Sequence, residues 1–132
     1  MSDPLANVLK MMSSSMQANT KRLRVAAENM ANAKSADYTP KNIEFKTKVD
    51  PRTKDSTLTV KRIYADDKRI KDVYDPLHPN ANKDGYVRMP DIDPLTEMMN
   101  IEQTKRDYSM AMRVHEVVTD IQHKTIKLIN AR

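Results

Sequence analysis

Apolar residues near the start of the chain recur with the spacing of an amphipathic helix. From about residue 5 to residue 33 they alternate in steps of four and three, the heptad pattern of a helix that packs against another helix. Asp3 and Pro4 are typical of a helix start, because an aspartate side chain caps free amide groups and proline suits the first turn. The pattern therefore predicts a helix that needs a neighbour. Its seam comprises Leu5, Leu9, Met12, Met16, Asn19, Leu23, Ala26 and Met30.

A second long helix is predicted from about residue 94 to residue 130, where Asp93, Pro94 and Glu97 again form a start signal. Its apolar residues change direction between Tyr108 and Val114, so one partner helix covers only part of them. Two long helices with spare apolar surface favour burial between subunits. An ordinary hairpin within one chain, with one stripe uncovered, stays open as an alternative. The apolar residues of this second helix fall into two sets. One set contains Met98, Ile101, Tyr108 and Met112, and the other contains Met110, Val114, Val117, Val118, Ile121, Leu128 and Ile129.

The segment between the helices has the alternating pattern of short β-strands. Apolar and charged residues alternate over residues 43–49 and 58–64, and residues 73–74 form a third, shorter run. Residues 50–55 separate the first two runs as a turn or exposed loop. The predicted fold is mainly α with a small β-rich middle. Long N- and C-terminal helices pair as a coiled-coil-like core, and a small sheet or pair of hairpins lies between them.

Composition and charge narrow the classes of function. Hydrophobic residues make up 39% of the 132 residues and charged residues 31%, which argues against a large single core. The net charge of +5 is spread along the chain, which favours a solvated surface over a nucleic-acid footprint. There is no cysteine, so disulfides and thiolate sites are excluded. We identify no cleavable secretory signal and no apolar stretch long enough to span a bilayer.

The candidate sites for chemistry are weak. Residues 80–85 with Asp91 have the spacing of an EF-hand calcium loop, but Pro76 and Pro79 prevent an entering helix, and a turn at Gly85 accounts for the pattern. His115 and His123 lie two helical turns apart, too far to ligate one ion together. The paired carboxylates and the serines at 13–15 have no catalytic partners. The sequence therefore predicts no cofactor, no metal, no small-molecule substrate and no enzymatic activity.

Two stretches carry a resemblance to a known family. Residues 23–33, followed by Tyr38 and Phe45, resemble the N-terminal signature of flagellar rod, hook and related axial proteins. Residues 74–79 and 84–93, followed by Glu97, are similar to one rod subunit in particular. The matching positions include Asn29, Asn32, Tyr38, Gly85, Tyr86, Met89, Pro90, Arg106 and Tyr108. The family usually has glycine where this chain has Asp37, and aspartate tolerates the left-handed backbone that such a turn requires.

The resemblance implies a structural subunit of the proximal flagellar rod that carries torque from motor to hook. It implies export through the flagellar secretion apparatus without a cleaved signal, and a place in the basal body within the cell envelope and periplasm. Its partners would be copies of itself, other rod proteins and the membrane ring at the base of the rod. The family arrangement implies three segments: an inner helix in residues 1–36, an outer β-rich segment in 37–91 and an inner helix in 92–132.

The resemblance also implies a role for each apolar stripe. The first-helix residues Leu5, Leu9, Met12, Met16, Leu23, Ala26 and Met30 would face the second helix of the same chain. Val114, Val118, Ile121 and Leu128 would face adjacent subunits, where flexible methionines help to adapt to related neighbours. Two alternatives remain open at this point: a sibling rod subunit, and a small basic coiled-coil adaptor or nucleic-acid-binding protein.

Overall fold

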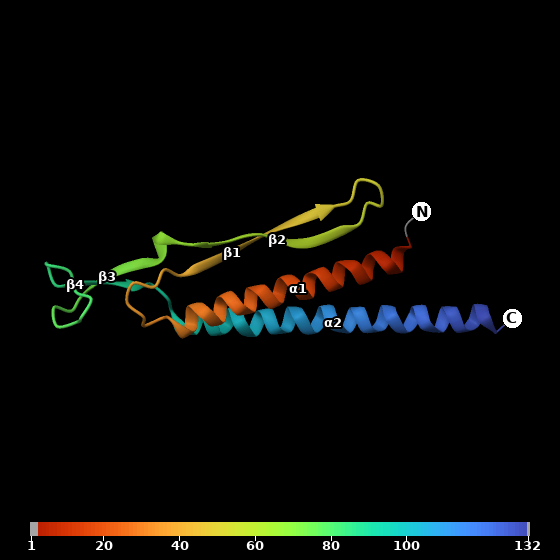
Figure 1. The fold of residues 1–132 in the computed structure, drawn as a ribbon. Coiled ribbons are helices and arrows are strands. Elements are labelled where there is room, and N and C mark those ends of the chain that lie inside the picture. Colours follow the sequence, from red (N-terminus) through yellow and green to blue (C-terminus); the bar gives the residue numbers. More distant parts are fainter. Residues whose placement is uncertain (1–2, 132) are drawn as a thin grey trace.

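Two long helices form the body of the molecule. The computed structural model describes residues 3–131, in which α1 spans Pro4–Ala31 and α2 spans Pro94–Asn130. The helices run antiparallel and pack along each other (Figure 1). Asp3 and Asp93 cap them by accepting hydrogen bonds from the amides of Leu5 and Leu95, as their sequences predicted. Residues 1, 2 and 132, the ends of the expected terminal segments, lie outside the described residues.

The face of α2 that packs on α1 is a heptad seam of mostly small or polar residues. Its buried residues recur every seven positions, so they lie on one side of the helix. On α1, Asn19 and Ala26 are buried with the same spacing. Small side chains allow the two helix axes to approach closely. The buried residues of α2 are Glu97, Thr104, Ala111 and Val118.

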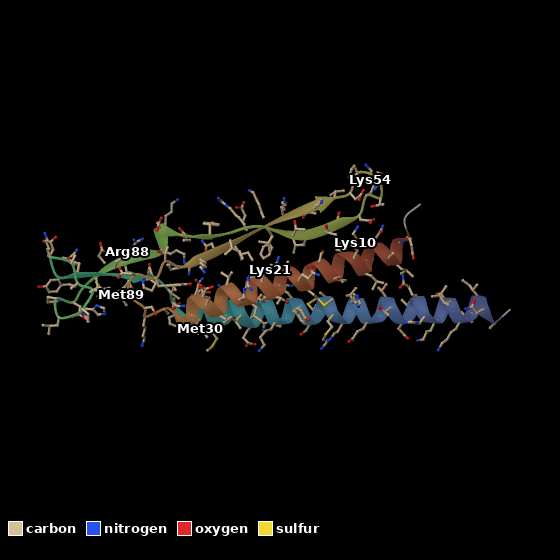
Figure 2. All side chains as sticks on the ribbon, in the orientation of Figure 1. Lys10, Lys21, Met30, Lys54, Arg88 and Met89 are labelled. Carbon is tan, nitrogen blue, oxygen red and sulfur yellow. The ribbon has the colours of Figure 1, made fainter. Side chains whose placement is uncertain are left out.

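A β-hairpin packs along the opposite side of α1 (Figure 1). Strands β1 (Lys41–Val49) and β2 (Ser56–Ala65) pair antiparallel, and we call this hairpin the arm. It contacts a second face of α1, where Ser14 Oγ accepts a hydrogen bond from the amide of Leu58 at 3.1 Å. Figure 2 shows Lys10 of α1 projecting toward the arm loop that carries Lys54. The helix α1 is thus covered by α2 on one side and by the arm on another.

A second hairpin extends beyond the end of the helix pair (Figure 1). After the short 3₁₀ helix η1 (Asp67–Arg69), strand β3 (Ile70–Tyr74) pairs antiparallel with β4 (Tyr86–Pro90). The sequence predicted only residues 73–74 as a strand here, and strand β4 was missed. Its five residues end in a proline and bury Val87 and Pro90, so they give little alternation to detect.

The fold class predicted from the sequence is confirmed: two long terminal helices flank a small β region made of two hairpins. Among residues 3–131, no helix is both long and apolar enough to cross a membrane.

Substitution of Gly85 tests the turn that closes the second hairpin. Gly85 has φ +83°, and a Cβ atom added there would lie 2.9 Å from Cε2 of Tyr74 and 3.1 Å from Cβ of Pro76. We expect Gly85→Ala to destabilise the hairpin by about 1 to 3 kcal/mol, because both the backbone angle and the close contacts disfavour a side chain. Hydrogen exchange at the β4 amides should accelerate, whereas Lys83→Ala, an exposed neighbour, should leave it unchanged. Unaltered β4 protection in Gly85→Ala would contradict this account of the turn.

Candidate assembly surfaces

Asn29 joins the end of α1 to the first strand of the arm. It is 2% exposed, and its Oδ1 accepts hydrogen bonds from the Lys41 amide at 2.8 Å and from the Tyr38 hydroxyl at 2.9 Å. Its Nδ2 donates to the Lys41 carbonyl at 2.8 Å. Burial, reinforced by the negative charge of Glu28, raises the pKa of the Tyr38 phenol, which therefore stays neutral and able to donate. One asparagine thus holds both backbone groups of Lys41.

Arg69 joins the arm to the start of α2. Its Nη2 donates to Oε1 of Glu97 at 2.8 Å, and its Nη1 donates to Oδ1 of Asn42 at 2.9 Å. Asn42 in turn donates through Nδ2 to Oδ2 of Asp66 at 2.7 Å. Glu97 is 5% exposed, so its carboxylate depends on the guanidinium for compensation of its charge. We call Asn29, Tyr38, Lys41, Asn42, Arg69 and Glu97 the joint.

A left-handed turn leads from α1 into the joint. Asp37 has φ +62°, which confirms the expectation that aspartate takes the conformation of the usual glycine. The Asp37 amide donates to the carbonyl of Arg88 at 2.9 Å, and its Oδ2 accepts from Nδ2 of Asn80 at 3.0 Å. Just before the turn, Asn32 caps α1 by donating from Nδ2 to the carbonyl of Glu28 at 2.9 Å. The turn thereby attaches the second hairpin to the end of α1.

The residues predicted to form the seam of the first helix differ in how deeply they are buried. Ala26 is buried, Leu5, Leu9, Met12, Met16 and Leu23 are half-buried, and Met30 is exposed where α1 ends (Figure 2). A cleft of about 310 Å³ is lined by Asn19 and Leu23 of α1 and by Thr104 and Tyr108 of α2. This cleft places the middle of the predicted seam directly opposite α2. Sequence reasoning missed the other packed face of α1, which contains Ser14, Ala18, Val25 and Asn29.

An apolar stripe along α2 is left uncovered by the rest of the chain. Five of its residues are exposed: Met110 by 66%, Val114 by 42%, Val117 by 59%, Ile121 by 44% and Leu128 by 73%. They are spaced by four, three and four residues from Met110 to Ile121, and Leu128 follows one heptad later, so they form a second heptad seam on α2. Val118, placed in this stripe by the sequence, instead shares the face of Thr104 and Ala111 toward α1 and is buried. Because α2 is longer than α1, its last turns also extend past the start of α1 (Figure 1).

The remaining family-matched residues occupy different surroundings. Pro90 is buried and Met89 is half-buried at the base of the second hairpin, next to a mostly apolar cavity of about 320 Å³. Tyr86 packs edge-on against Tyr74, with ring centroids 5.3 Å apart. On α2, exposed Arg106 donates to Oε1 of Gln103 at 3.2 Å, and Tyr108 lines the cleft toward α1.

The calcium-like loop is organised as a turn. Oδ1 of Asn82 accepts hydrogen bonds from the amides of Asp84 at 3.0 Å and Tyr86 at 2.9 Å. This oxygen, which would have to ligate calcium, therefore stabilises the backbone. Within the described part of the chain, no group of three or more side chains suited to a metal ion comes together.

The fold and these surfaces define an elongated, mainly helical protein in which one face of α2 is buried against α1 and a second, apolar face is exposed. The sequence is similar over nearly its whole length to flagellar basal-body rod proteins. It is 31% identical to the FlgC rod protein of Agrobacterium fabrum, with 98% of each chain covered. It is 32% identical to that of Salmonella typhimurium and 28% identical to that of Buchnera aphidicola from Acyrthosiphon pisum, each covering 94% of this chain and 97% of the relative. No protein-family model matches the chain. The chain belongs to the family of the flagellar basal-body rod protein FlgC.

Proposed function

We propose that this chain is a structural subunit of the bacterial flagellar basal-body rod, that it assembles through its terminal helices and that it transmits torque from motor to hook. The observation that carries the proposal is the second heptad seam on α2, from Met110 to Leu128, which remains exposed after α2 has packed on α1. A monomer gains nothing from a long exposed apolar stripe, whereas a polymer buries it between subunits. Membership of the rod-protein family supports the same role.

In this proposal the helices form the inner layer of the rod, and the arm and second hairpin lie outside them. Residues 1–36 and 92–132 would supply the inner segments and residues 37–91 the outer one. The partners are further copies, related rod proteins and the membrane ring at the rod's base. The chain would reach the periplasm through the flagellar export apparatus, without cleavage of a signal.

The experiment is deletion of the gene, followed by electron microscopy of purified basal bodies and immunoblotting of the complemented strain. We expect deletion to leave basal bodies without a complete rod and cells without motility. Complementation should restore both and place the chain in the purified basal bodies. Complete rods in the deletion strain would reject the proposal. A nucleic-acid-binding adaptor would instead show salt-dependent DNA affinity with motility unaffected.

A further inference from the structure

We propose that Arg69 fixes the orientation of the arm relative to the helix pair, so that the two move as one body. The consequence for force transfer rests on the proposed function, because only a rod subunit passes torque between its outer and inner parts. The orientation itself is a property of the single chain and can be measured separately.

Arg69 contacts several parts of the fold that are distant in sequence. Its guanidinium bonds Glu97 in the first turn of α2 and Asn42 in β1. Its backbone carbonyl accepts a hydrogen bond from the amide of Asp91, between β4 and α2, at 2.8 Å. Its own amide donates to the carbonyl of Asp66 at 3.0 Å. A movement of the arm against α2 would therefore disturb several bonds of this one residue.

The apolar packing of the arm on the helices is shallow. No residue of β1 or β2 is buried; their side chains are half-buried near the helices and exposed elsewhere. Toward the arm's loop, the polar contacts with α1 include a hydrogen bond at Ser14 and the Lys10–Asp55 ion pair at 3.5 Å. Lys10 is exposed, so water screens its attraction to Asp55. The best-buried polar contacts of the arm lie at the joint.

The geometry of the Arg69–Glu97 ion pair is suited to holding the arm at a fixed angle to α2. A guanidinium is planar and presents its donors in a rigid fork, so it can hold Glu97 and Asn42 only in one relative placement. Glu97 is buried, so water cannot readily replace the arginine as its partner. Lysine carries the same charge on a single flexible ammonium group and cannot reproduce the fork.

The experiment measures distances within the full chain by double electron–electron resonance. The chain has no cysteine, so spin labels can be placed at will. One label pair, Lys48→Cys with Glu116→Cys, reports the arm against α2. A second pair, Ala27→Cys with Glu116→Cys, reports the helix pair. The label sites are all exposed. Each label pair is measured in four backgrounds: the parent chain, Arg69→Met, Arg69→Lys and the neighbouring control Lys68→Met.

We expect Arg69→Met to broaden the arm-to-α2 distribution and displace its centre, while the helix-pair distribution stays narrow. Arg69→Lys should give an intermediate broadening, and Lys68→Met none. An unchanged arm distribution in Arg69→Met would overturn the proposal. So would equal broadening of both label pairs, because Arg69 would then act only on overall stability. Ala111→Gly, which weakens the helix seam away from the joint, should not broaden the arm distribution selectively.

The effect on force transfer is measured as the swimming speed of cells. We expect Arg69→Met cells to build rods and swim in dilute medium, but to lose more speed than Lys68→Met cells as viscosity is raised. Equal loss of speed in the two strains would reject a role in force transfer while leaving the measured orientation intact. Absence of the chain from basal bodies in both strains would contradict the proposed function and not the role of Arg69.

Discussion

Ile121→Asp is expected to abolish rod assembly while leaving the folded monomer unchanged. Ile121 lies in the exposed seam of α2, where the monomer already leaves it in contact with water. A carboxylate there costs the monomer little, since a helix surface tolerates aspartate at a few tenths of a kcal/mol. Within a subunit interface the same carboxylate is buried without a partner, which costs about 3 kcal/mol or more per contact. Each contact would therefore weaken by about a hundredfold or more.

The measurement combines circular dichroism of the purified variant with electron microscopy of basal bodies from cells that express it. Val118→Asp is the matched comparison, three residues away on the same helix. Val118 is buried toward α1, so its aspartate should lower the helix content and stability of the monomer itself. Glu116→Gln, an exposed polar change, should affect neither readout. Normal rods in cells that express Ile121→Asp would show that the exposed seam of α2 is not a subunit interface.

The helices could be predicted from the sequence because their signals are local. Asp3 with Pro4 and Asp93 with Pro94 mark both starts, and the heptad spacing identifies the face of α1 toward α2. The arm was predicted because its strands alternate apolar and charged residues over many positions. Strand β4 was missed because five residues ending in proline resemble an irregular segment, and their partner strand ends more than ten residues earlier.

The joint could not be predicted from the sequence as a site. Arg69 and Glu97 are 28 positions apart, and in sequence each is one charge among many that are solvated. Ser14 and Ala18 carry too little apolar character to show that α1 has a second packed face. Asn29 was singled out only by family resemblance, because a buried asparagine has no periodic signature. Val118 was assigned to the stripe facing adjacent subunits for a related reason: two seams on one helix lie close enough in angle that spacing alone does not separate their members.

Asn29→Ala is expected to destabilise the folded chain by about 2 to 4 kcal/mol. The substitution removes three hydrogen bonds, to the amide and carbonyl of Lys41 and to the Tyr38 hydroxyl. These partner groups are part-buried at the base of the arm, where alanine leaves them without the asparagine. A buried group that loses its partner costs about 1 to 3 kcal/mol, and the three losses are not additive.

Urea unfolding monitored by circular dichroism measures this effect, with Asn32→Ala as the matched control at the end of the same helix. Asn32 is half-buried, and its side chain caps the carbonyl of Glu28 and accepts one exposed hydrogen bond from the Ser35 hydroxyl at 3.3 Å, so its loss should cost about 1 kcal/mol. Tyr38→Phe removes only the hydroxyl partner and should fall between the parent chain and Asn29→Ala. Equal effects of Asn29→Ala and Asn32→Ala would mean that Asn29 is no more than a helix-end residue. A larger effect at Asn29, with loss of protection at the Lys41 amide, identifies it as the residue that attaches the arm to α1.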